Sequence, residues 1–263
     1  MIKAAILAGS TIVHALLPAS ATAGAQSIEA ARTAQAEGRF LEAAELGEAL
    51  NTSEGCALAA ESLAIHGYYI ATNDEKEALF ERAMQLAQEA VRLDPSNPEA
   101  HVQSAHAMGR HGQTIGALEA VGRGYAEKVR DALESALRLD PEMASAHLSL
   151  ATWHAEVVNG VGGFVAGAIY GAKKKKAVAH YEKALELAPD EKVVPVEYAL
   201  GLLLLDDDRN RERARDLLVQ ALEIPSKDAY DRILHQGTVE KLAALERRES
   251  GARKSGSRDS NGR

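Results

Sequence analysis

Histidine is the side chain best suited to proton transfer or metal binding near neutral pH. His101, His106 and His111 follow one another at intervals of five residues. Each interval turns about 140° net around a helix, so these three side chains diverge. His147 and His154 are seven residues apart and share a helical face, but no carboxylate or third histidine repeats that spacing. We expect histidines that pack in the interior or at a groove edge, with no metal site and no catalytic site.

Motifs for nucleophilic catalysis and phosphate binding are also missing from the sequence. It contains no G-x-S-x-G elbow and no H-E-x-x-H motif. The run GAIYGAKK at 167–174 lacks the spacing of a phosphate loop, and no serine or threonine follows its lysine. The single cysteine, Cys56, lies among small apolar residues, which indicates a buried thiol. We therefore expect a protein that binds without catalysing and that requires no cofactor.

The most unusual spacing lies in GVGGFVAGAIYGAKKKK, residues 160–176. Five glycines separate large apolar residues, and four lysines follow: Phe164, Val165, Ile169 and Tyr170, then Lys173, Lys174, Lys175 and Lys176. A weaker copy, TIGALEAVGRGYAEK, occupies residues 114–128. In one interpretation, each insert extends the core and leaves its lysines in solvent. In the other, the inserts wall a groove for an apolar ligand or touch a membrane. Apolar burial dominates in both, at roughly 1.5–3 kcal/mol per side chain against about 1 kcal/mol per lysine near anionic lipid.

The elements that must position these residues are recurrent helices. AVRLDP ends at Pro95, ALRLDP at Pro141 and ALELAP at Pro189, and a shorter copy, ALEIP, ends at Pro225. In each case an apolar helical stretch stops at a proline, which cannot continue a helix. One such unit cannot bury its apolar face alone, so neighbouring units must stack.

The composition agrees with a stack of helices. Hydrophobic residues make up 46% of the 263 residues, while aromatic residues make up only 4%. Sheets favour aromatic and β-branched residues, so an all-α protein is expected. The net charge of -8 offers no general attraction to nucleic acid.

The helix–turn–helix unit with small residues at the crossings resembles the tetratricopeptide repeat. Gly38, Phe40, Ala136 and Asp140-Pro141 match that pattern best. Successive prolines are 46 and 48 residues apart, beyond the usual 34, so an insert must separate the two helices of two repeats. We expect a right-handed α-solenoid of about four such hairpins with long intra-repeat inserts, spanning residues 24–248 and ending in a capping helix at about 227–248.

From residue 98 onward the sequence is similar to the regulator of microtubule dynamics family. Its marks are the histidines at the heads of two helices, His101 and His147, then Trp153, and the segment IPSKDAYD at 224–231 before the last helix. The resemblance implies a tetratricopeptide-like architecture and a groove that is apolar or faces lipid. Microtubule binding, which belongs to eukaryotic members, is not expected of a secreted bacterial protein.

The two ends of the chain differ from its body. Lys3, an apolar run at 4–17, Pro18 and the small residues of Ala21-Thr22-Ala23 are typical of a secretory signal peptide. They predict a signal at 1–23, cleavage near Ala23 and a periplasmic mature protein. The tail at 249–263 is basic and rich in glycine and serine, which predicts disorder.

These observations predict a non-enzymatic periplasmic scaffold that holds a protein or peptide partner. Its concave groove would be lined partly by Val102, His106, Leu148 and Thr152. The alternative is a lipid or apolar-ligand binder that uses residues 160–172. In that case Phe164, Val165, Ile169 and Tyr170 line the pocket, and Lys173, Lys174, Lys175 and Lys176 meet an anionic headgroup or membrane surface. No nucleic-acid partner is expected.

Overall fold

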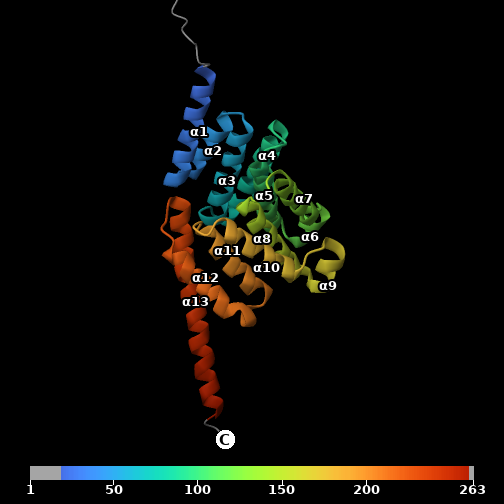
Figure 1. The fold of residues 1–263 in the computed structure, drawn as a ribbon, viewed down its shortest axis with the longest axis vertical. Coiled ribbons are helices and arrows are strands. Elements are labelled where there is room, and N and C mark those ends of the chain that lie inside the picture. The colour runs from blue at the N-terminus through green and yellow to red at the C-terminus, as the bar shows by residue number, and fades with distance from the viewer. Residues whose placement is uncertain (1–18, 261–263) are drawn as a thin grey trace, which may run out of the picture.

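The computed structural model describes the backbone of residues 19–260 and the side chains of residues 28–247, except 117 and 207 (Figure 1). Every regular element in the described part is a helix. The elements are α1 (Ala19–Glu37), α2 (Phe40–Ala49), α3 (Ser53–Tyr69), α4 (Asn73–Leu93), α5 (Pro98–Ile115), α6 (Ala117–Gly122), α7 (Tyr125–Leu139), α8 (Ala144–Val161), α9 (Gly163–Val165), the π-helical turn η1 (Ala166–Tyr170), α10 (Lys174–Leu187), α11 (Val193–Leu205), α12 (Asp207–Glu223) and α13 (Ala229–Ser260).

The helices stack as successive pairs: α1–α2, α3–α4, α5–α7, α8–α10 and α11–α12, with α13 as the final helix. Each pair packs on the next, and this confirms the all-α solenoid of tetratricopeptide-like hairpins. The described part contains five pairs, one more than the expected four, because α1 pairs with α2. The two inserts lie where the sequence predicts, between the first and second helices of the α5–α7 and α8–α10 pairs.

The turns between repeats are fixed by local hydrogen bonds around the prolines. Asp94 Oδ1 accepts from the backbone N–H of Ser96 at 2.9 Å, and Asp140 Oδ1 accepts from that of Glu142 at 3.0 Å. These equivalent turns satisfy backbone donors that the ended helix no longer serves. The Asp-Pro dipeptide is therefore the local cause of these two reversals.

The histidines at the helix heads serve these same turns. His101 Nε2 lies 2.9 Å from the carbonyl oxygen of Pro95, and His147 Nε2 lies 3.1 Å from that of Pro141. Each ring donates its proton, since a carbonyl oxygen only accepts. Each histidine lies six residues after its repeat's proline, so the two occupy equivalent places and fasten the preceding turn.

Small residues allow the helices of the stack to approach closely. Ala43 and Ala136 are completely buried. A Cβ added to Gly47 on α2 would lie 2.6 Å from the backbone oxygen of Gly55 on α3, so these two backbones are in contact. Cys56 on α3 is buried in a cluster with Ala90 and Ala100, and burial raises the pKa of its thiol, as expected for an unreactive cysteine.

The solenoid curls until its last helix reaches its first repeats. Ala229, at the start of α13, packs with Phe40 of α2 and Ile65 of α3. The rings of Tyr69 and Tyr230 meet edge to face with centroids 5.7 Å apart. In Figure 1, α13 and α1 lie along the same edge of the molecule. This seam converts an open array into a closed ring of helices, which the sequence did not predict.

The two ends depart from the expected boundaries. Residues 1–18 of the expected signal peptide lie outside the described residues, and α1 begins at Ala19 and runs through the expected cleavage point near Ala23. At the other end, α13 continues to Ser260, so the structure corrects the end of the capping helix near residue 248 and the disorder expected at 249–260. Adding turns to an established helix is easier than starting one, and no proline interrupts this segment. None of the described helices combines the length and the apolar character needed to span a membrane.

Candidate functional site

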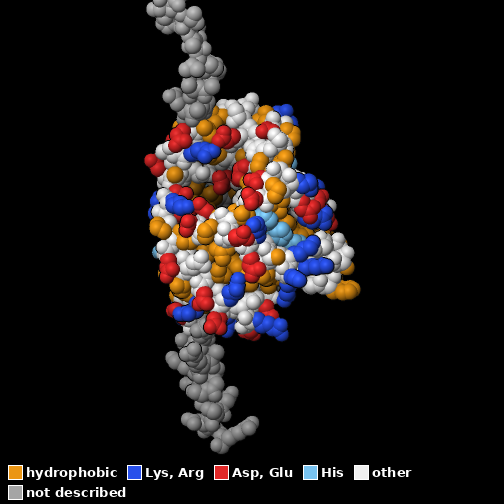
Figure 2. Space-filling model, viewed as in Figure 1, with side chains coloured by type: hydrophobic (Ala, Val, Ile, Leu, Met, Phe, Trp, Pro, Cys, Tyr) orange, Lys and Arg blue, Asp and Glu red, His pale blue; other side chains and the backbone are white. Residues whose placement is uncertain are grey.

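The ring of helices surrounds a cavity of about 1150 Å³. Its walls come mainly from the first helices of four pairs, α3, α5, α8 and α11, together with α7 and the capping helix α13. The cavity exists because the seam between α13 and the first repeats closes the curve. Figure 2 shows a hollow beside α3 with acidic side chains around it.

Carboxylates dominate the charge of the cavity wall. Glu61, Glu99, Glu156 and Glu197 face it, against the cations Arg110 and Lys241. Three of the carboxylates accept hydrogen bonds from neutral amides: Glu61 from Gln35 Nε2 at 2.9 Å, Glu99 from Gln103 Nε2 at 2.6 Å, and Glu156 from Gln113 Nε2 at 3.2 Å. An amide satisfies a carboxylate oxygen but supplies no opposite charge.

Enclosure changes how these acids ionise. Burial and, to a smaller extent, the neighbouring Glu99 raise the pKa of Glu61 from its ordinary 4.5 to about 7. Burial also raises the pKa values of Glu99, Glu156 and Glu197. The cation of Arg110 opposes that rise for Glu156 and Glu197. The cavity is thus poised to gain from an added positive charge.

Aromatic rings hold Arg110 in this wall. Its guanidinium carbon lies 3.7 Å from the centroid of the Tyr68 ring, a cation–π arrangement. The ring of Tyr68 in turn contacts that of Tyr69 edge to face, with ring centroids 4.7 Å apart. Because the stacked ring fixes one guanidinium face, Arg110 is a positioned cation rather than a freely moving one.

Three of the four predicted groove residues lie on the cavity wall: His106, Leu148 and Thr152. His106 Nε2 lies 2.6 Å from Ser149 Oγ. Although His106 keeps solvent contact through the cavity, burial lowers its pKa to about 4, helped by Arg110. Val102 is the exception, since it is completely buried in a core cluster with residues of α7 and does not line the groove.

The insert residues are placed differently from the apolar-pocket prediction. Phe164, Val165 and Ile169 are 89%, 38% and 65% exposed and do not line the cavity, so their expected placement is corrected. Of that set Tyr170 alone lies on the cavity wall. Left-handed glycines at both ends of the insert turn the chain outward, which is the physical reason. The four lysines at 173–176 are exposed, with Lys174 Nζ donating to the carbonyl oxygen of Leu205 at 2.7 Å.

A histidine cluster lies apart from the cavity wall. His147 Nδ1 lies 2.9 Å from His180 Nδ1, and the ring of His154 stacks on that of His180 with centroids 5.9 Å apart. Because His147 uses Nε2–H toward Pro141, its Nδ1 accepts, and His180 donates from Nδ1. Burial lowers the pKa values of His154 and His180 to about 4, with a neighbouring histidine adding to the effect. Among the described side chains, no group of three or more His, Cys, Asp or Glu residues is arranged to hold a metal.

The sequence prediction missed the acidic wall and His180. Glu61, Glu99, Glu156 and Glu197 all belong to first helices of pairs that are otherwise rich in apolar and small residues. In α5, α8 and α11 the glutamate is the single carboxylate of the helix, and this was the available signal. His180 gave no comparable signal, because its partners come from a different helix.

Comparisons with known proteins agree with this architecture. The family described as "Regulator of microtubule dynamics protein 1-3" matches residues 31–246. No curated protein matches the sequence.

Among solved structures, a thermophilic TPR protein of Thermus thermophilus, TTC0263, is similar with a TM-score of 0.59 and 19% identity, covering 82% of this chain and 98% of that one. YrrB, "a TPR protein with an unusual peptide-binding site", has a TM-score of 0.39 and 12% identity, covering 84% and 98%. A human IFIT1 dimer with PPP-AAAA has a TM-score of 0.42 and 18% identity, covering 79% of this chain and 51% of that one. At 19% identity, the similarity to TTC0263 is one of fold.

Proposed function

We propose that this chain, which belongs to the regulator of microtubule dynamics protein 1-3 family, is a binding scaffold that holds a segment of a partner protein in its central cavity. The observation that carries the proposal is the cavity itself. Its volume of about 1150 Å³ exceeds the range of roughly 300–1,000 Å³ that is usual for small-molecule sites. The successive first helices of the repeats wall it, so a linear segment can contact several repeats at once.

The charge of the wall indicates what kind of segment fits. Glu156 and Glu197 share the nearby cation Arg110, while the hydrogen bonds that Glu61 and Glu99 accept come from neutral amides. A lysine or arginine of the partner would relieve the repulsion between neighbouring carboxylates and gain charge-assisted hydrogen bonds. Tyr68 and Tyr230 also line the cavity and add aromatic surface to its wall. The proposed partner segment therefore carries at least one basic residue.

A peptide library presented to the purified protein tests this proposal. Gly109 on α5 faces the cavity with no atom within 4 Å of an added Cβ, so Gly109→Phe fills the cavity without a clash at the point of attachment. Gly237 on α13 has the same open surroundings but lies off the cavity wall, and Gly237→Phe is the matched control.

The wild type and Gly237→Phe should enrich the same lysine- and arginine-containing peptides. Gly109→Phe should bind those peptides at least about tenfold more weakly, a loss of roughly 1.4 kcal/mol. Equal binding by all three proteins would show that the cavity is not the site.

A lipid or another apolar ligand is the competing occupant, because Leu133, Leu148 and Trp153 give the cavity an apolar component. Mass spectrometry of a solvent extract of the purified protein separates the two. A stoichiometric lipid that Gly109→Phe excludes would favour the apolar-ligand function. A lipid-free preparation that binds basic peptides favours the scaffold.

Secretion is a separate part of the proposal. Lys3, the apolar run at 4–17 and the small residues near Ala23 support export to the periplasm, where the partner would be met. Removal of residues 1–23 would retain the α1 side chains that pack on the next helices, from Ile28 onward. Expression of the full chain in a Gram-negative host, followed by N-terminal sequencing of the periplasmic fraction, tests this. A full-length protein confined to the cytoplasm would contradict it.

A further inference from the structure

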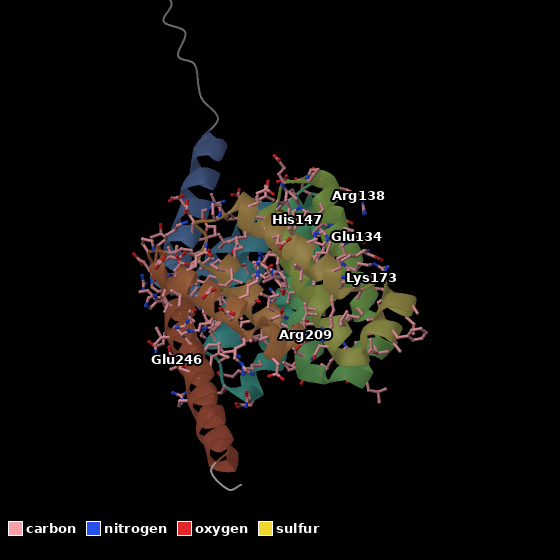
Figure 3. All side chains as sticks on the ribbon, turned by 60° about the horizontal axis from the view of Figure 1, so that its bottom comes forward. Glu134, Arg138, His147, Lys173, Arg209 and Glu246 are labelled. Atoms are coloured by element: carbon pink, nitrogen blue, oxygen red, sulfur yellow. The ribbon has the colours of Figure 1, made fainter. Side chains whose placement is uncertain are left out.

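The two inserts are built alike. Each is bounded by glycines in the left-handed region, Gly116 and Gly124 with φ of +90° and +66°, and Gly162 and Gly171 with φ of +78° and +70°. An added Cβ at any of the four would meet no atom within 4 Å, so backbone conformation rather than space requires glycine. These paired reversals project α6 and α9 from the same edge of the molecule, as both Figure 1 and Figure 3 show.

Both inserts expose large apolar side chains, and the second insert is anchored by two small buried ones. Ala166 and Ala172 are completely buried. The exposed side chains are Leu118 (89%), Phe164 (89%), Ile169 (65%) and Val121 (57%). Single exposed apolar residues are common on protein surfaces, but a group of them on two neighbouring projections indicates an interaction surface.

Basic side chains flank these projections. Lys173, Lys175 and Lys176 are exposed, and within residues 28–247 none of the three forms an ion pair with an acid. Lys173 lies next to the projecting α9 insert (Figure 3), and Figure 2 shows blue side chains beside the orange tip at this edge. This local positive charge stands out because the whole chain carries a net charge of -8.

We propose that the tips of α6 and of α9–η1 dock on an anionic membrane surface. Phe164, Ile169 and Leu118 would enter the boundary between headgroups and acyl chains, and Lys173, Lys175 and Lys176 would contact lipid phosphates. A few apolar side chains at the ends of two projections, with cations set beside them, match the layered chemistry of such a surface.

The shape of this surface distinguishes a membrane from a protein partner. A stable protein interface buries about 800 Å² per partner on a continuous patch. Here the apolar side chains lie on two separate short turns, α6 and α9–η1, bounded by glycines. A deformable lipid surface can receive both turns at once, whereas a second copy of the chain would have to offer two matching sockets. Val121 and Tyr170 also line one end of the cavity, so docking would turn that end toward the membrane.

Tryptophan quenching by brominated lipid tests insertion directly. Phe164→Trp and Leu118→Trp place a fluorophore on each tip. Val239→Trp on α13, where the native valine is 42% exposed, is the matched control. The native Trp153 is only 5% exposed and supplies a constant background. Brominated vesicles that contain phosphatidylglycerol should quench the two tip variants and leave the control unchanged.

Vesicle co-sedimentation then separates the apolar and electrostatic contributions. Phe164→Ser with Ile169→Ser should weaken binding about tenfold or more, whereas the control Val239→Ser should not change it. Replacing Lys173, Lys175 and Lys176 with glutamine should weaken binding about tenfold at low salt and much less at high salt. As a control, glutamine replaces three other exposed cations, Arg138, Arg209 and Arg215, which removes the same amount of charge away from the tips.

Three results would overturn the proposal. The first is no binding to anionic vesicles. The second is binding without quenching of either tip variant. The third is a concentration-dependent dimer that Phe164→Ser abolishes, which would assign the tips to a second copy. None of these results bears on peptide binding in the cavity, so the two proposals fail independently.

Discussion

The cavity wall and the insert tips both bury small residues, but the wall encloses its large side chains whereas the tips expose theirs. In both regions alanine is buried, as at Ala105 on the cavity wall and Ala166 in the second insert. On the wall, enclosure by the ring raises the pKa values of the glutamates. At the tips, no element covers Phe164. The difference shows that the environment of a side chain depends on whether distant repeats close around it.

The seam that closes the ring gives the largest expected effect. Gly38 has a φ of +91°, and its added Cβ would lie 2.9 Å from the Cβ of Ala229 on α13. Gly38→Ala should lower the free energy of unfolding by about 2–4 kcal/mol, since backbone strain and a clash add together. Gly116 has nearly the same φ, +90°, with no atom nearby, so Gly116→Ala should lower it by about 1 kcal/mol. Chemical denaturation checks both, and equal losses would mean that the seam contributes nothing.

Because the buried Glu61 favours its protonated form, we expect its contribution to the stability of the folded state to fall as pH rises. The pKa of Glu61 is raised to about 7 from 4.5, so the folded state favours the protonated acid. That preference is fully present below about pH 4.5 and is lost as pH increases toward 7. Glu61→Gln should therefore raise the free energy of unfolding by on the order of 2 kcal/mol at pH 8 and by little at pH 4. Glu127→Gln at an exposed position is the control, and an identical gain there would refute the effect of enclosure.

The histidine cluster predicts the opposite pH dependence. The pKa values of His154 and His180 are lowered to about 4 from 6.5, so the folded state favours neutral rings. Their contribution is present above about pH 6.5 and is lost as pH falls toward 4. In His180→Asn the amide nitrogen replaces the Nδ1 donor to His147, and the acid-dependent loss between these pH values should shrink by about 1 kcal/mol. Thermal melts across this range check it, and a curve parallel to that of the wild type would count against the assignment.

The tips give the smallest expected effect on stability. Phe164→Ser should change the free energy of unfolding by less than about 0.5 kcal/mol, because the side chain is 89% exposed. Ala166→Leu, two residues away at a completely buried site, should lower it by about 1–3 kcal/mol through overpacking. If the larger loss followed Phe164→Ser, the insert would pack on the body in solution, contrary to the structure.

Features of this protein that depend on neighbouring residues were predictable from its sequence. Proline lies two residues after the end of α4, α7, α10 and α12, Asp94 and Asp140 make the turns at the first two of these prolines, and alanine marks the crossings. The positions of both inserts and the equivalent places of His101 and His147 follow from repeat spacing, whereas the hydrogen bonds of these histidines to the preceding turns do not.

Only the tertiary structure decided the features that depend on the angles between successive helix pairs. The angle between one helix pair and the next is set by side-chain packing, and it accumulates over the array until Ala229 meets Phe40 and Ile65. That meeting creates the cavity and desolvates its glutamates. The pairing of His180 with His147 and the outward direction of Phe164 likewise depend on contacts between separate elements. Periodicity in a sequence specifies which face of a helix is apolar, but what lies opposite that face is fixed only when the repeats have stacked.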